Sequence, residues 1–138
     1  NLMKKFKILF ITFIASCIFC ALGASADSYK AWVSLELKPL KDIYTSDSYS
    51  KTVWGNQYAK KNYATDKLSG DERAVEVRLQ NITSGWTTLP KGQITQLNTG
   101  STNLGQSTGT YKLQIRLKKS TPSGALFGGT WYLDDTLI

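Results

Sequence analysis

The chain contains no histidine, and its only methionine and both of its cysteines lie within the first 20 of 138 residues. Those residues belong to a predicted secretory leader. Three lysines, Lys4, Lys5 and Lys7, precede an apolar run over 8–22, and Ala24-Ser25-Ala26 is typical of a cleavage site. We therefore expect a helical signal peptide over 1–26, with Met3 as its start, followed by a single secreted β domain over 27–138.

The apolar run of the leader has 15 residues, fewer than the roughly 20 that a transmembrane helix needs. We expect no permanent membrane span in the mature form. Cys17 follows Ile14-Ala15-Ser16, a sequence that resembles a bacterial lipidation site, so the alternative is a protein anchored by lipid at Cys17. An exported domain without cystine is typical of a Gram-positive bacterium.

Several kinds of chemistry are excluded from the mature domain, because it has no cysteine, histidine or methionine. Thiolate or imidazole catalysis, metal sites built from those groups, and a disulfide framework all require the missing residues. We expect no cofactor and no metal. The carboxylates of Asp71-Glu72 and Asp134-Asp135 are interpreted as solvated turn residues, so the sequence favours a protein that is not an enzyme.

Apolar and polar residues alternate with a period of two in three segments, 31–37, 74–80 and 111–118. Such alternation is typical of strands with one face toward a core and one toward water. With short turns between the segments and no helical pattern after the leader, we expect an all-β antiparallel sandwich of about seven short strands, or alternatively a small β-barrel. The predicted core comprises Val33, Leu35, Val75, Val77, Leu79, Leu113, Ile115 and Leu117. The turn over 120–124 is expected to close a hairpin between the last two strands, and Gly128-Gly129 to mark a bulge or a close backbone approach.

Tyrosine and tryptophan dominate the aromatic residues of the predicted mature domain, with seven Tyr and four Trp against a single Phe. Both types combine an apolar ring with a polar group, which suits wet binding surfaces as well as cores. Trp32 falls on the polar phase of its predicted strand, and the segment 44–63 mixes aromatic rings with amides and lysines. The candidate ligand-binding residues are Trp32, Tyr44, Tyr49, Trp54, Asn56, Tyr58 and Tyr63, with core filling as the alternative.

Basic side chains form the second candidate surface. Lys112, Arg116 and Lys118 share the outward phase of one predicted strand, and Arg78 lies on the outward phase of another. The expected partners are an anionic cell-wall polymer, a polysaccharide or lipid headgroups, which a cationic exported protein meets first. Nucleic acid is not expected, because the domain carries only +4 and no helix to enter a groove.

These patterns together indicate a secreted, non-enzymatic binder of the bacterial cell surface or of an extracellular glycopolymer. A bacteriocin-like or toxin-like antagonist acting on a cell envelope is the alternative, and a small hydrolase is the third possibility.

Overall fold

The computed structural model describes residues 28–97 and 105–138, so the expected leader lies outside the described residues. The described chain is mostly β, with antiparallel sheets that do not close into a barrel. Its elements are β1 (Tyr29–Leu37), β2 (Tyr44–Thr45), β3 (Tyr49–Lys51), β4 (Tyr58–Asp66), β5 (Val75–Leu79), β6 (Thr87–Thr88), β7 (Ile94–Gln96), β8 (Gly109–Tyr111), β9 (Leu113–Leu117), β10 (Ala125–Tyr132) and the 3₁₀ turn η1 (Asp135–Leu137).

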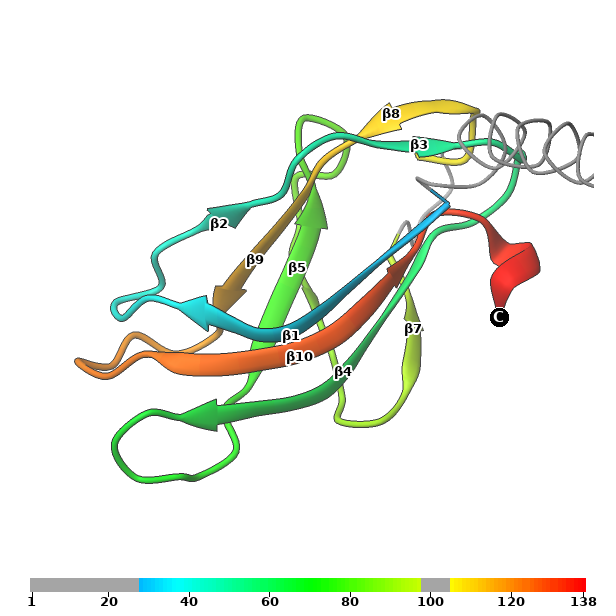
Figure 1. The fold of residues 1–138 in the computed structure, drawn as a ribbon. Helices are drawn as coiled ribbons and strands as arrows, with labels where there is room; N and C mark the ends of the chain where they lie inside the picture. Colours follow the sequence, from blue (N-terminus) through cyan, green and yellow to red (C-terminus); the bar gives the residue numbers. More distant parts are fainter. Residues whose placement is uncertain (1–27, 98–104) are drawn as a thin grey trace, which may run out of the picture.

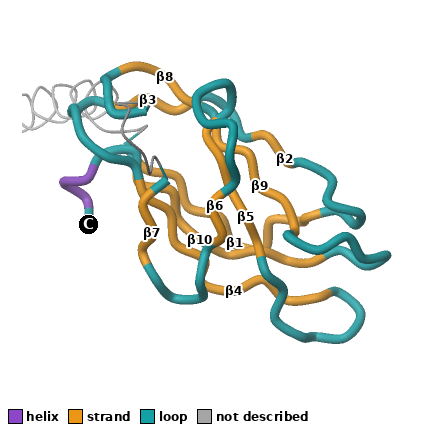
Figure 2. Tube along the Cα trace, turned by 180° about the vertical axis from the view of Figure 1, so that it is seen from behind, coloured by secondary structure: helices purple, strands orange, loops and turns teal. Residues whose placement is uncertain are grey.

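Two four-stranded sheets face each other across the molecule (Figures 1 and 2). Sheet A has the order β1-β10-β4-β7, and sheet B has the order β2-β9-β5-β6. The pair β3-β8 extends the pair β2-β9, and Ser46 joins the two pairs because Leu113 N donates to its Oγ at 2.9 Å. This interruption divides two longer strands into four, which is one reason why the expected number of about seven strands is too low.

The core between the sheets confirms most of the predicted inward residues. Val75, Val77 and Leu79 of β5 are buried, as are Leu113, Ile115 and Leu117 of β9. Sheet A contributes side chains of very different size to this core, from tryptophan to alanine: Phe127, Trp131, Leu37, Ala59 and Ala64. The indole N–H of the fully buried Trp131 donates to Gln57 Oε1 at 2.9 Å, so its polar group is satisfied inside the core.

The first strand departs from its predicted alternation. Trp32 is only 8% exposed whereas Val33 is 85% exposed, so both the expected outward position of Trp32 and the core position of Val33 are wrong. The cause is a bulge, since the register with β10 shifts between Trp32 and Leu35. Ser34 takes a left-handed φ of 62° there, and its N–H donates to Tyr63 Oη at 3.0 Å. Beyond the bulge Leu35 turns back toward the core and is half-buried.

The turn before the last strand does not close a hairpin, contrary to expectation. β9 belongs to sheet B and β10 to sheet A, so residues 118–124 carry the chain from one sheet to the other. β10 pairs instead with β1 and β4. Gly128 and Gly129 do lie at a shift of the register with β4, and a Cβ at Gly129 would approach Lys60 O to 2.4 Å. The expected bulge and close backbone approach are therefore confirmed.

Buried charges close the two ends of the layered structure. At one end, Arg73 and Ser123 bond Asp66 Oδ2 at 2.8 and 2.6 Å. At the other end, Asp134 is only 2% exposed and faces the buried Lys51. The interpretation of Asp134 as a solvated turn carboxylate is therefore wrong, because the chain folds β3 over the segment that follows β10. In the described ranges, no helix is long and apolar enough to cross a membrane.

Candidate functional site

Three tyrosines form a row across the outer face of sheet A. Tyr132 of β10 is the register partner of both Tyr29 on β1 and Tyr58 on β4. The adjacent residues Trp131 and Ala59 are buried in the core, so strand alternation directs the tyrosines away from it. Because directly opposite residues on paired strands have Cβ atoms about 4.5–5.5 Å apart, the three rings start from evenly spaced positions on one surface.

The rings of this row are not occupied by contacts with one another. The ring contacts of the described residues join Trp32 to Tyr44 and Phe127, and Tyr49 to Trp131. Tyr29 is 54% exposed, and Tyr58 and Tyr132 are half-buried. Within the described part of the chain, none of the three phenol hydroxyls has a hydrogen-bond partner. Among the described residues, the three hydroxyls and the exposed parts of the rings therefore have no protein partner that would compete with a ligand.

Short and largely uncharged side chains surround the row. The next outward positions along the strands are Ala31, Thr130, Lys60 and Ile94, which are register neighbours across β1, β10, β4 and β7. Ala31 and Thr130 reach less far from the sheet than tyrosine. The rings can therefore stand above this part of the surface, with Lys60 as the cation of that second row.

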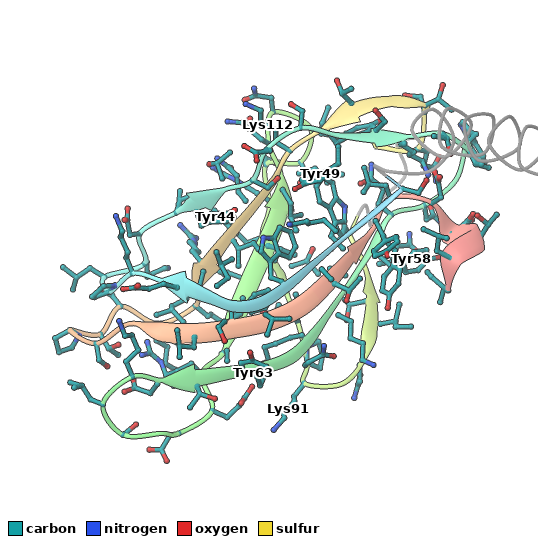
Figure 3. All side chains as sticks on the ribbon, viewed as in Figure 1. Tyr44, Tyr49, Tyr58, Tyr63, Lys91 and Lys112 are labelled. Carbon is teal, nitrogen blue, oxygen red and sulfur yellow. The ribbon has the colours of Figure 1, made fainter. Side chains whose placement is uncertain are left out.

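Tyr63 lies on the same sheet face but has a structural contact. Its hydroxyl accepts the Ser34 N–H, and its ring covers Gly128, where a Cβ would approach Tyr63 Cε1 to 2.3 Å. Tyr63 therefore holds the β1 bulge against the glycine of β10. Figure 3 shows Tyr58 and Tyr63 along β4, near its start and farther along it.

The remaining aromatic candidates separate into core and surface. Tyr44 and Tyr49 lie between the layers (Figure 3), where Tyr44 meets Trp32 edge-on at 6.4 Å and Tyr49 meets Trp131 at 5.9 Å. Trp32, Tyr44 and Tyr49 therefore fill the core, which was the alternative to a role in ligand binding. Trp54 is 61% exposed in the loop that leads into Tyr58.

Asp134 holds the loop that presents Trp54. Its carboxylate accepts hydrogen bonds from Thr52 N and Val53 N at 3.1 and 3.0 Å and from Thr52 Oγ1 at 2.6 Å. Burial raises the pKa of Asp134, but these hydrogen bonds and the Lys51 charge outweigh it and lower the pKa overall. The loop also bonds Gln106, through Gly55 N and the side chain of Asn56. Asn56 thus contributes to the shape of the loop.

The four basic candidates lie on sheet B and not beside the tyrosine row. β5 and β9 are neighbours, with Arg78 opposite Gln114 and Arg116 opposite Glu76. Lys112 and Lys118 are exposed and flank β9, immediately before and after the strand. The sequence thus groups these residues as the structure does, but they lie on the sheet opposite the candidate Tyr58 and the tyrosine row.

Two residues of the tyrosine row, Tyr29 and Tyr132, were not among the sequence candidates. Alternation with the buried Trp131 could have placed Tyr132 outward, but its pairing with Tyr58 depends on the strand order.

Comparisons of the chain with protein-family models, with curated proteins and with solved structures find no match. Among the described residues, no group of three or more Asp or Glu side chains could hold a metal ion.

Proposed function

We propose that the chain is a secreted, non-enzymatic β-sandwich that binds the bacterial surface through an extracellular glycopolymer. The observation that carries the proposal is the row of Tyr29, Tyr132 and Tyr58 on the outer face of sheet A. Aromatic rings stack on the C–H faces of sugars, and phenol hydroxyls exchange hydrogen bonds with sugar hydroxyls. A row across three strands suits an extended chain of sugars better than one small molecule.

The largely uncharged side chains next to the row support a sugar chain as the occupant. Lys60 is the charged side chain of the second row, and its neighbours Ala31 and Thr130 are small. Trp54 lies four residues before Tyr58, the first residue of β4, and adds a mostly exposed ring near that end of the strand. We therefore expect Trp54 to extend the same binding surface.

Retention on purified cell walls stripped of their anionic polymers tests the proposal. We expect Tyr58→Ala and Tyr132→Ala to weaken retention by about tenfold each, since one aromatic contact contributes roughly 0.5–1.5 kcal/mol beyond its buried area. Trp54→Ala should also weaken retention while leaving the melting temperature nearly unchanged. The control is Leu68→Ala, which removes an exposed apolar side chain from the turn at the opposite end of β4.

Unchanged retention in all three aromatic variants would overturn the proposal. Release of dye from lipid vesicles by the wild-type protein, with no retention on walls, would instead favour an antagonist of the cell envelope.

A further inference from the structure

Two arginines converge on one indole ring on the outer face of sheet B. The guanidinium carbons of Arg78 and Arg116 lie over the ring of Trp86, at 4.4 and 3.9 Å from its centroid. Their separation therefore cannot exceed the sum of these two distances. Arg78 and Arg116 come from the paired strands β5 and β9, and Trp86 immediately precedes β6, the edge strand beside β5.

Each guanidinium is held in place through its Nε. Arg78 Nε donates to Gln114 Oε1 at 2.7 Å, and Arg116 Nε donates to Glu76 Oε1 at 2.7 Å. Gln114 is itself fixed, because its Nε2 donates to Thr45 Oγ1 at 3.2 Å. Within the described residues, the terminal Nη groups of both arginines have no hydrogen-bond acceptor. Each guanidinium thus keeps four N–H donors for a ligand.

The third arginine of the chain shows what a purely structural guanidinium looks like in this protein. Arg73 Nη1 donates to Asp66 Oδ2 at 2.8 Å and to Ser123 O at 3.2 Å, and its Nη2 donates to Lys119 O at 3.2 Å. Its terminal nitrogens are used within the fold. Those of Arg78 and Arg116 are not, although both side chains are already positioned by stacking and by Nε.

The local charge is positive despite Glu76. This carboxylate lies 2.7 Å from Arg116 Nε and 4.0 Å from Lys41 Nζ, and Arg78 lies beyond it on the same strand. Two cations therefore face this carboxylate, and a third lies two residues along the same strand. An anion bound here gains from a net positive field as well as from individual hydrogen bonds.

We propose that Arg78 and Arg116, held against Trp86, form a binding site for a phosphate ester. Planar guanidinium groups match phosphate oxygens with two parallel hydrogen bonds, and such charge-assisted bonds are about twice as strong as neutral ones. Stacking on the indole fixes both groups before the ligand arrives, which reduces the entropy lost on binding. The site lies on the sheet opposite the tyrosine row, so it does not depend on the glycan-binding proposal.

Titration with glycerol 3-phosphate at constant ionic strength, followed by the NMR signals of the arginine Nε–H groups, tests the site. We expect Arg78→Gln and Arg116→Gln each to weaken binding by at least about tenfold. Arg78→Lys keeps the charge but loses the planar fork, and we expect several-fold weaker binding. The matched control is Lys118→Gln, which removes one charge outside the cluster and should change the affinity less than about twofold.

Circular dichroism checks that each variant is folded. If Arg116→Gln does not fold because Glu76 loses its partner, Arg78→Lys tests the site in its place. No binding by the wild-type protein would overturn the proposal, as would equal losses in Lys118→Gln and Arg78→Gln. A poly(glycerol phosphate) chain and phosphatidylglycerol vesicles then distinguish the source of the ester. Binding to either one supports the site, and binding to neither contradicts it.

Discussion

Removing the Asp134 carboxylate should destabilise the fold strongly, because three hydrogen bonds and a buried ammonium depend on it. In the wild-type protein Lys51 Nζ lies 3.5 Å from Asp134 Oδ1 and donates to Leu133 O. In Asp134→Ala it keeps the bond to Leu133 O but loses its counter-charge inside the protein. Breaking a buried ion pair by deleting one partner costs about 3–5 kcal/mol. That is a large share of the roughly 5–15 kcal/mol that stabilises a typical protein.

Three further variants separate this explanation from a general loss of packing. Asp135→Ala alters the exposed neighbour and should change the free energy of unfolding by less than about 0.5 kcal/mol. Asp134→Asn keeps the size of the side chain but also removes the counter-charge of Lys51, so it should cost nearly as much as Asp134→Ala if the ion pair, and not packing, is responsible. Adding Lys51→Met to Asp134→Ala removes the unpaired charge, so the double variant should be more stable than Asp134→Ala alone.

Urea unfolding followed by circular dichroism measures these differences. A cost below about 1 kcal/mol for Asp134→Ala would refute the reasoning, because it would mean that the buried ammonium finds another partner or water at no cost. A double variant no more stable than the single one would contradict the role assigned to Lys51.

Three other predictions concern the core and the acid limit of stability. Val33→Thr should change the free energy of unfolding by less than about 0.5 kcal/mol, whereas Trp32→Ala should cost about 3–5 kcal/mol, and the opposite order would contradict the bulge in β1. Ile115→Ala should cost about 2–5 kcal/mol in the same urea assay, and a cost below about 1 kcal/mol would remove that residue from the core. Hydrogen bonds from Ser123 and from backbone N–H groups lower the pKa of Asp66 below its unfolded value of about 3.9, so its contribution is present above that pH and is lost as the pH falls below it. The urea midpoint should therefore drop between pH 6 and pH 3, and Asp66→Asn should reduce that drop.

Sequence alternation predicts β5 and β9 well because neither strand contains a bulge and the apolar residues of each strand lie on one face. Val75, Val77 and Leu79 therefore keep one phase, as do the inward residues of β9. β1 fails the same test, since a serine with φ of 62° inserts one step into the pattern. Serine carries no strong preference for that conformation, and the contact that stabilises it comes from Tyr63, 29 residues away.

The pairing of the strands could be predicted less well than their existence. A polar turn of five residues between two strands is typical of a hairpin, but 120–124 crosses between sheets because β10 fills the gap between β1 and β4. The tyrosine row follows from that crossing, since it sets Tyr132 between Tyr29 and Tyr58. The sequence places Arg78 and Arg116 on the outward faces of two strands, so it predicts that they meet if those strands are neighbours. The contact of both with Trp86 could not be predicted, because it depends on the position of β6.

The use of the aromatic side chains separates structural from available rings. Trp32, Phe127, Trp131 and Tyr111 belong to the core cluster, and Tyr44 and Tyr49 pack against it. Tyr63 fixes the bulge of β1, and Trp86 supports two guanidiniums. Four aromatic rings then have no structural contact of this kind in the described chain: Tyr29, Trp54, Tyr58 and Tyr132. Tyr29 and Trp54 are exposed and contribute little to folding, whereas Tyr58 and Tyr132 are half-buried, so the proposed glycan-binding surface combines two exposed rings with two that the sheet partly covers.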